Sequence, residues 1–390
     1  MFSHLLAMLL SIVAPAGQDR AEPVHQAQME ARIRVAPQIV SGSDGQRHLA
    51  YELQVTSFYS GDAPLRLTRL AIFPDGATQP MRVIEGAELA GLLGTSIDDA
   101  SARGGIPIAN GTSRMLFLWL TLPAGVNPAS LRHQLSFRAD KDALQRADDV
   151  RTAVVTAPPV RIGPPLRGGR WLAVEGPGNH LSHHWGSAVA IDGTLSIPQR
   201  YAIDWFGLDA GNHSIRGAHA SLAATVDADW VGYGADVLAV RDGVVVDVRD
   251  GIPNGKPLAP QQVPEDLTTR SLYGNFVVLR IAPGVYAHYA HLQTGSVQVR
   301  PGQHLRRGTV IGRLGQTGSA GAPHLHFHIS DRPGFERSEG LPFVIDAFDL
   351  LGSAKIEESF DPAVPLVLHA PAVRARHAAL PLDGDVVSFR

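Results

Sequence analysis

The chain has 390 residues, a net charge of −3 at neutral pH and no cysteine. A chain of this length usually forms two domains. The small net charge argues against nucleic acid or an anionic membrane surface as a partner, because both attract strongly basic proteins. Without cysteine, the chain can form neither a disulfide nor a thiolate metal site, so His, Asp or Glu must hold any metal.

Residues 1–16 have the features of a secretory signal peptide. An apolar run at residues 5–13 is followed by Ala-Pro-Ala at residues 14–16, a small-x-small pattern typical of a cleavage site. The run is too short to cross a membrane as a helix. We therefore expect no membrane span and an exported protein, located in the periplasm or outside the cell.

Residues 24–156 predict a β domain. Glycine and proline clusters separate runs of alternating polar and apolar residues at 29–40, 49–57, 65–72, 113–122 and 131–139. Short strands at this spacing are typical of a two-sheet sandwich of immunoglobulin-like type. No cluster of His with acidic residues occurs here, so we expect a module that shields the following domain or binds a partner, without chemistry of its own.

A proline-rich connection at residues 157–166 marks the best candidate linker. Residues 167–352 again show strands and turns, so an all-β fold is expected for both domains. The segment at 353–390 contains several prolines and few periodic apolar positions. It predicts an extended tail that closes with one edge strand.

Residues 323–330 read Pro-His-Leu-His-Phe-His-Ile-Ser. Side chains alternate between the two faces of a strand, so His324, His326 and His328 share one face, opposite three apolar side chains. This pattern favours a strand that packs against a core and presents a metal site or a proton-transfer site. The alternative is that neutral histidines only form hydrogen bonds on a half-exposed strand.

A set of motifs upstream of this strand occurs in a fixed order. Asp204 ends a mostly apolar run that begins at residue 199, and its carboxylate is expected to have a partner. The other motifs are Tyr-Ala-His-Leu at 289–292, Gly-Gln at 302–303, Gly-x-x-x-Gly at 308–312, Thr-Gly at 317–318 and His-Leu-His-Phe at 324–327. In order and spacing, residues 200–329 resemble the lysostaphin-type zinc endopeptidases, which cut peptide cross-links in bacterial cell walls.

The resemblance implies a small antiparallel β-sheet domain with one zinc ion in a groove across the sheet. It implies that Asp204 and His326 are zinc ligands and that His291 and His324 are the catalytic pair. Zinc accepts imidazole nitrogen and carboxylate oxygen, and a catalytic zinc site keeps one position for the water that it activates. One histidine of the pair would accept the proton of that water, and the other would stabilise the oxyanion. His328 is expected either to orient a ligand or to be solvated.

Arg200 stands where the family has its first histidine ligand, and a guanidinium cannot bind zinc. In one interpretation another histidine replaces this ligand: we choose His183, followed by His184 and His180, because their segment leads into the Asp204 strand. The chain would then be a zinc metalloendopeptidase that hydrolyses peptide bonds, with peptidoglycan cross-links as the expected substrate. In the other interpretation Arg200 pairs with Asp204, and the domain binds cell-wall peptides or regulates a partner hydrolase without hydrolysis.

Overall fold

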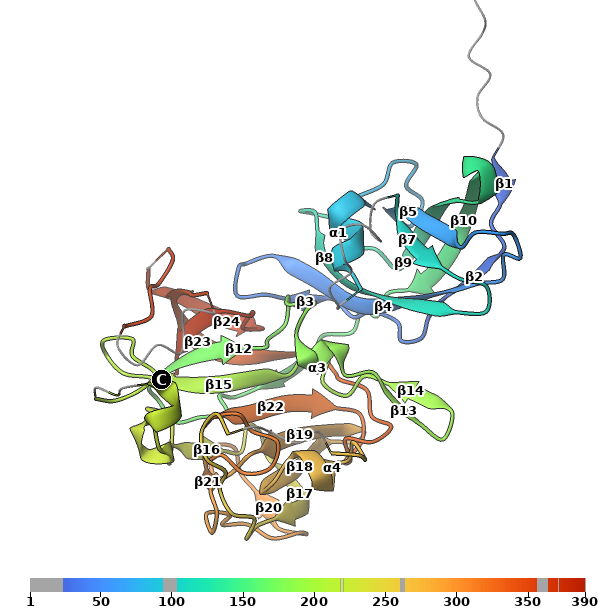
Figure 1. Ribbon diagram of the computed structural model, residues 1–390. Helices are drawn as coiled ribbons and strands as arrows, with labels where there is room; N and C mark the ends of the chain where they lie inside the picture. Colours follow the sequence, from blue (N-terminus) through green and yellow to red (C-terminus); the bar gives the residue numbers. More distant parts are fainter. Residues whose placement is uncertain are drawn as a thin grey trace, which may run out of the picture.

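The computed structural model describes residues 24–93, 104–217, 219, 221–259, 264–355, 364–370 and 372–389. The expected signal peptide lies outside these residues. Strands dominate the described residues, with only short helical turns between them, and the expected all-β fold is confirmed (Figure 1). Among the same residues, no helix is both long and apolar enough to cross a membrane.

The N-terminal part consists of two sheets. In one sheet the strand order is β1-β10-β9-β5-β6, with β7 added to β5; in the other it is β2-β4-β3, with β8 added to β4. The elements are β1 (His25–Gln26), β2 (Met29–Ile33), β3 (Val40–Ser41), β4 (Arg47–Ser57), β5 (Leu65–Pro74), β6 (Arg82–Glu85), α1 (Gly86–Gly91), β7 (Ile106–Ile108), β8 (Ser113–Leu122), β9 (Ser130–Arg138), η1 (Asp140–Asp142) and β10 (Leu144–Ala153).

These two sheets pack face to face around one core. Leu53 of β4 and Leu118 of β8 belong to the same buried cluster as Leu70 of β5 and Phe137 of β9. Alternate residues of each strand supply this cluster, as the period-two pattern of the sequence requires. The N-terminal part is therefore a β-sandwich, and its immunoglobulin-like type stays a prediction.

The C-terminal part is built on an eleven-stranded sheet with the order β11-β23-β25-β12-β15-β22-β19-β18-β17-β20 and with β24 added to β23. Its elements are β11 (Val160–Ile162), β12 (Arg170–Val174), β15 (Ile203–Leu208), β17 (Gly243–Arg249), β18 (Phe276–Ala282), β19 (Val285–Ala290), β20 (His304–Leu305), β22 (Leu325–Ser330), β23 (Phe343–Ser353), β24 (Arg374–Ala379) and β25 (Asp385–Ser388). Beside it lie α3 (His183–Gly186), β13 (Val189–Ile191), β14 (Thr194–Ser196), η2 (Leu222–Ala224), η3 (Asp227–Asp229), β16 (Asp236–Leu238), α4 (Thr269–Leu272) and β21 (Val310–Arg313).

Three strands lie in the segments that were expected to be a linker and an extended tail: β11, β24 and β25. The expected linker contains β11, which pairs in parallel with β23. The expected tail contains β25, which pairs with both β12 and β23 and is therefore an interior strand rather than an edge strand. The domain boundaries at 157–166 and 352 remain predictions, and the sheet crosses both of them.

The histidine-bearing strand is β22, and the predicted alternation of its side chains is confirmed. Leu325, Phe327 and Ile329 are fully buried in the main hydrophobic cluster. His326 and His328 project from the other face, and β22 lies between β15 and β19. Its apolar face therefore packs into the core at the centre of the sheet. The histidines of its other face lie next to side chains of the two neighbouring strands.

The sandwich and the large sheet share a continuous apolar contact. The cluster under the large sheet includes Ala50 and Phe117 of the sandwich together with Trp185 and Tyr201. The rings of Phe117 and Trp185 meet edge to face with their centroids 5.9 Å apart. Figure 1 shows α3, which carries Trp185, at the junction of the two parts.

We predict that Phe327→Ala lowers the free energy of unfolding by about 3–5 kcal/mol, because a buried phenylalanine leaves both its transfer energy and a cavity behind. Phe327 is fully buried and its ring contacts those of Tyr289 and Phe343. Urea unfolding followed by tryptophan fluorescence measures the change. Phe58→Ala is the control, since that side chain is 56% exposed; equal midpoints for the two variants would contradict the prediction.

Candidate functional site

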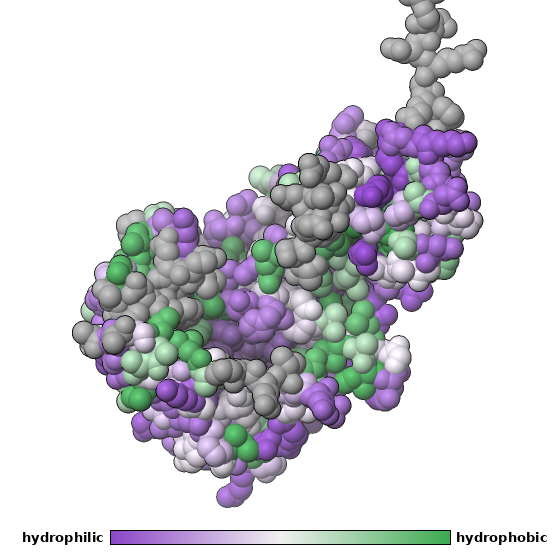
Figure 2. All heavy atoms as spheres, in the orientation of Figure 1, coloured by the Kyte–Doolittle hydropathy of each residue, from purple (hydrophilic) through white to green (hydrophobic). Residues whose placement is uncertain are grey.

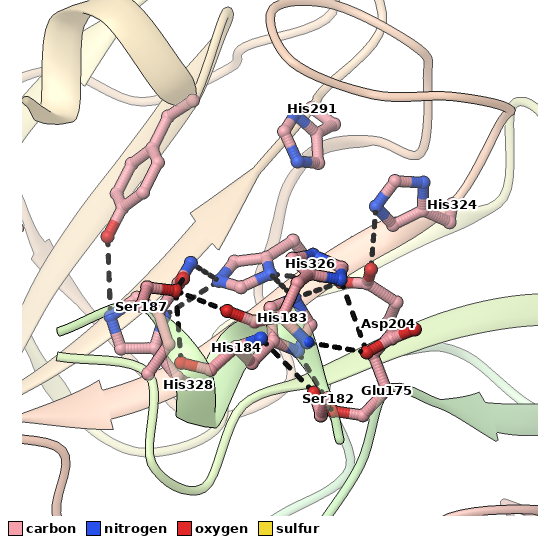
Figure 3. Close-up of polar contacts among 12 residues, drawn as sticks. Glu175, Ser182, His183, His184, Ser187, Asp204, His291, His324, His326 and His328 are labelled. Atoms are coloured by element: carbon pink, nitrogen blue, oxygen red, sulfur yellow. Dashed lines mark hydrogen bonds and ion pairs between the residues drawn. The ribbon is translucent and has the colours of Figure 1, made fainter. Parts of the chain in front are cut away.

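The register of three strands brings the predicted residues together. Asp204 of β15 lies directly opposite His326 of β22, and Ala290 of β19 lies opposite His326 on the other side. His291 follows the end of β19, and His324 precedes the start of β22. Residues directly opposite one another on neighbouring strands have their Cβ atoms about 5 Å apart, so this register alone groups the four side chains (Figure 3).

Three atoms that can bind a metal, each from a different segment of the chain, converge at the centre of the site. His326 Nδ1 lies 2.9 Å from Asp204 Oδ1 and 3.2 Å from His184 Nε2. His184 Nε2 lies 3.4 Å from the same Asp204 oxygen. All three residues are buried. Two ligands of one tetrahedral zinc ion lie about 3.3 Å apart, so these separations match those of a zinc ligand set.

His184 reaches the site because the chain turns sharply after β12. Glu175, with φ of 54°, directs its carbonyl oxygen at two donors: the Ser182 hydroxyl at 2.8 Å and His184 Nδ1 at 3.0 Å. The Ser182 side chain also accepts from the backbone N–H of His184 and caps α3. Since Nδ1 of His184 carries the proton, its Nε2 has a free lone pair facing Asp204.

His291 is held by its backbone conformation and by a carbonyl. Its φ of 64° is rare for a residue other than glycine, and its Nδ1 donates to the Thr317 carbonyl at 2.8 Å. Thr317 is placed by the close approach of two glycines: a Cβ on Gly274 would lie 2.3 Å from the Thr317 carbonyl carbon, and one on Gly318 would lie 2.3 Å from the Gly274 nitrogen. The Thr-Gly motif therefore sets the orientation of the His291 ring.

His324 has the same kind of support. Its Nδ1 donates to the Ala322 carbonyl at 2.7 Å, and its ring stacks on Phe206 with the centroids 5.1 Å apart. Its Nε2 lies 3.4 Å from the second carboxylate oxygen of Asp204. The rings of His291 and His324 are 4.8 Å apart. Both side chains thus turn Nε2, the nitrogen not bonded to a carbonyl, towards the site.

Burial and the Asp204 carboxylate determine the pKa values of the ionisable side chains in the site. Burial alone would raise the pKa of Asp204, but His184 and His324 outweigh it and hold the pKa well below its usual range. Burial lowers the pKa of His326 to about 4 and that of His291 well below its ordinary value. Burial also opposes a charge on His324, yet the adjacent Asp204 raises its pKa. The site at neutral pH therefore combines an ionised carboxylate at Asp204 with neutral imidazoles at His291 and His326.

A chain of hydrogen bonds supports His326 from behind. His326 Nε2 lies 2.9 Å from His328 Nδ1, and His328 Nε2 lies 3.3 Å from the Tyr273 hydroxyl. In the tautomer that leaves His326 Nδ1 free for a metal, Nε2–H donates to His328, which in turn donates to Tyr273. The side-chain amide of Gln199 lies 3.1 Å from the same Nε2, and in this tautomer it accepts from Nε2–H when its oxygen is turned towards the ring. His328 is fully buried, so the alternative of a solvated His328 is wrong.

The predicted third ligand, His183, lies at the edge of the site. Its side chain is 67% exposed, and its Nδ1 pairs with the Glu175 carboxylate at 3.2 Å. The donor atoms of His183, His184 and Asp204 lie within 4.8 Å of one another, a looser group than the one formed with His326. The geometry therefore favours His184, the second choice from the sequence, over His183.

Arg200 lies in a turn before β15 and not on the strand with Asp204. Its guanidinium bonds Glu52 of the sandwich, at 2.7 Å and 2.9 Å, and Glu339 at 2.8 Å. The pairing of Arg200 with Asp204, on which the non-catalytic interpretation was based, does not occur among these contacts. Asp204 faces the histidines instead.

The site opens into a cavity of about 360 Å³. Histidines and Asp204 line its floor, and Leu267, Leu272 and Phe335 form an apolar wall. Figure 2 shows a hydrophilic hollow in the middle of this face with apolar areas beside it. Such a cavity can hold a peptide with an apolar group against the wall and a peptide bond above the histidines.

Three residues of this arrangement did not emerge from the sequence. Gln199 and Tyr273 belong to none of the motifs in the sequence, and nothing in their spacing shows that they reach His326 and His328. Glu52 is 148 residues from Arg200 along the chain, in a part where no site was expected. The turn chemistry of Ser182, a helix-capping residue before two histidines, is the one local signal that favours His184.

We predict that His288 makes the stability of the metal-free chain depend on pH. The ring stacks on His328 with 4.4 Å between centroids, and burial lowers its pKa from 6.5 to about 3. Below pH 6.5 the His288 imidazole binds a proton in the unfolded chain but stays neutral in the folded chain. The free energy of unfolding therefore falls as the pH falls from 6.5 towards 3.

In His288→Phe this loss between pH 6.5 and pH 5 should be smaller by about 2 kcal/mol, since 1.36 kcal/mol corresponds to one pKa unit. Urea unfolding at the two pH values measures it, with His369→Phe as the exposed control. A variant that loses as much stability as the wild type would refute the prediction.

Comparison with known proteins identifies part of this region. Residues 228–336 match the model of Peptidase family M23. The match includes His291, His324 and His326 and begins after His184 and Asp204. Over 72 residues, the chain is 42% identical to proteins named DD-carboxypeptidase/endopeptidase Mpg from Neisseria meningitidis and Neisseria gonorrhoeae. This alignment covers 18% of the chain, which spans about a sixth of the length of these relatives.

Solved structures show weaker likeness. The catalytic domain of the antimicrobial peptidase lysostaphin from Staphylococcus simulans has 18% identity and a TM-score of 0.23, over 45% of this chain and 88% of that one. The M23 metalloprotease pseudoalterin from the deep sea has 13% identity and a TM-score of 0.27, over 57% and 99%. These values support no conclusion about function. The sequence match is the stronger finding: residues 228–336 of this chain match Peptidase family M23, in agreement with the resemblance to lysostaphin-type peptidases.

Proposed function

We propose that the chain is a zinc-dependent metalloendopeptidase and that His184, Asp204 and His326 hold one zinc ion. The observation that carries the proposal is the convergence of His184 Nε2, Asp204 Oδ1 and His326 Nδ1 within 3.4 Å of one another. Each atom comes from a different segment of the chain. Burying a carboxylate next to two imidazole lone pairs costs free energy unless a cation binds between them.

The residues fit zinc in number, type and support. Two imidazole nitrogens and one carboxylate oxygen form a typical catalytic set, in which a fourth position is left for water. The second nitrogen of each imidazole is engaged, His184 Nδ1 by the Glu175 carbonyl and His326 Nε2 by His328. When bound, zinc would supply a Lewis acid that polarises a carbonyl group and lowers the pKa of water.

His291 and His324 would act on the reacting groups. Each donates Nδ1–H to a backbone carbonyl, so each presents a lone pair on Nε2. One ring can take a proton from the attacking water while the other, protonated, donates a hydrogen bond to the oxyanion. Asp204, 3.4 Å from His324, would stabilise a charge on that ring. These roles need no group beyond the two histidines and the ligand set.

The third ligand in this proposal is His184 rather than His183. His184 is buried and its Nε2 faces Asp204, whereas the exposed His183 is engaged by Glu175. The replacement of the family's ligand histidine by Arg200 therefore leaves the ligand set complete. This supports an intact metal site over a degenerate one.

A peptide of the bacterial cell wall is the proposed substrate. The family match supports a peptidase, and the two Neisseria relatives are named as a carboxypeptidase and endopeptidase. An exported protein, as the start of the sequence predicts, would meet peptidoglycan in the periplasm or outside the cell. Incubating the zinc-loaded chain with purified sacculi, with and without a chelator, tests the substrate: chelator-sensitive release of new amino groups is expected, and release of none would exclude it.

We predict one zinc ion per chain after dialysis against zinc, and its loss in His184→Ala. His183→Ala should keep the zinc content of the wild type, because its imidazole is outside the ligand triangle. Metal analysis of the purified variants measures both. Zinc retained by His184→Ala and lost by His183→Ala would reverse the assignment; a wild type that takes up no zinc would end the proposal.

We predict that His291→Ala keeps its zinc and loses hydrolysis by about 10²–10⁴-fold, the usual contribution of a general acid or base. The His291 ring lies beside the ligands without donating to them, so metal content separates a catalytic loss from a binding loss. The rate of sacculus digestion and the zinc content are measured together. His304→Ala, at an exposed position, is the control. A rate within two-fold of the wild type would exclude His291 from catalysis.

A further inference from the structure

We infer that Glu52, on β4 of the N-terminal sandwich, is a positioning residue of the metal centre: it fixes both α3, which carries His184, and the turn that carries Gln199. The inference rests on the proposed ligand set and extends it into a domain in which the sequence predicted no role in chemistry. It makes the sandwich a structural part of the site.

The Glu52 carboxylate joins two chains of contacts, here called arms. The first runs through Trp185 to His184, and the second through Arg200 and Gln199 to His326. Glu52 Oε1 accepts from Trp185 Nε1 at 2.6 Å and from Arg200 Nε at 2.7 Å. Glu52 Oε2 accepts from Arg200 Nη2 at 2.9 Å. Glu52, Trp185 and Arg200 are all buried. Charge-assisted bonds of this length in a dry environment have a fixed geometry, so the positions of both partners follow that of Glu52.

The first arm leads to His184. Trp185 follows it in α3, and its ring packs edge to face on Phe117 and Trp119 of β8, with centroids 5.9 Å and 6.3 Å away. A helix of only four residues has little stability of its own, so the contacts of Trp185 set the orientation of α3. The sandwich supplies these ring contacts and the acceptor for Nε1. His184 Nε2 is therefore directed towards Asp204 by a surface of the N-terminal domain.

The second arm leads to His326. Gln199 precedes Arg200, and its amide lies 3.1 Å from His326 Nε2. Arg200 also donates to the Gly340 carbonyl at 3.1 Å and to Glu339, so its turn is fixed on both sides. The Ser187 hydroxyl, at the end of α3, lies 3.2 Å from the Gln199 side-chain amide and connects the two arms.

This network explains what an arginine does at the position of a ligand. Its guanidinium points away from the proposed metal ligands and joins the two domains by its bonds to Glu52 and Glu339. His184 supplies the third ligand instead. Loss of Glu52 would leave Trp185 Nε1 without its acceptor and Arg200 with Glu339 as its remaining acidic partner. Both arms would then lose the contact that orients them.

The test measures zinc affinity of the full chain by competition with a chromogenic chelator, together with the visible spectrum of the cobalt(II) form. Glu52→Gln and Trp185→Phe should each weaken zinc binding about 10-fold or more, the range seen when a partner of a metal ligand is removed, and should change the cobalt spectrum. Trp185→Phe keeps every charge and decides the case if Glu52→Gln does not fold. Glu30→Gln, which removes an exposed carboxylate of the same sandwich, should leave both readouts unchanged.

Two comparisons separate this inference from the proposed function. If His184→Ala binds zinc as the wild type does, the proposed ligand set fails. If His184→Ala loses zinc while Glu52→Gln and Trp185→Phe bind it within two-fold of the wild type, the positioning role alone is overturned.

Discussion

A single buried carboxylate determines how this site is organised. An ionised Asp204 in the interior is very unfavourable unless charges or donors surround it. The strand register supplies His326 from one neighbour, α3 supplies His184, and the residue before β22 supplies His324. Each of these side chains is in turn fixed through its other nitrogen by a carbonyl or an imidazole. The polar face of the sheet is thus a network in which each of these rings is oriented by a partner of its own.

The apolar face and the polar face of β22 depend on one another. Phe327 and its neighbours hold β22 in the core, and the same strand presents His326 on the opposite face. Because side chains alternate along a strand, a register slip of one residue would bury the histidines among apolar residues and expose the core. The tight core around β22 therefore also maintains the chemistry of the site.

The local part of this arrangement could be predicted from the sequence. Period-two alternation identified the histidine strand, and the resemblance to lysostaphin-type peptidases grouped Asp204, His291, His324 and His326. The identity of the third proposed ligand could not be predicted in this way. His183 and His184 are adjacent in the sequence, and what distinguishes them is the carbonyl of Glu175, the capping by Ser182 and the packing of Trp185. The direction of the Glu175 carbonyl follows from the left-handed conformation of that residue, and the packing of Trp185 involves a domain far away in the chain. Pattern reasoning does not capture contacts of that range.

The interior position of β25 has a consequence for the order in which the molecule folds. β25 lies between β12 and β23, and the backbone N–H of Gly384, just before it, donates to the carbonyl of Ala173 at the end of β12. Glu175, whose carbonyl orients His184, follows two residues later. The part of the sheet that supports His184 therefore closes only after residues 385–388 have left the ribosome. Pairing over such a sequence distance is slow, so a nascent chain passes through a period with its histidine strand synthesised and its candidate metal site still unassembled.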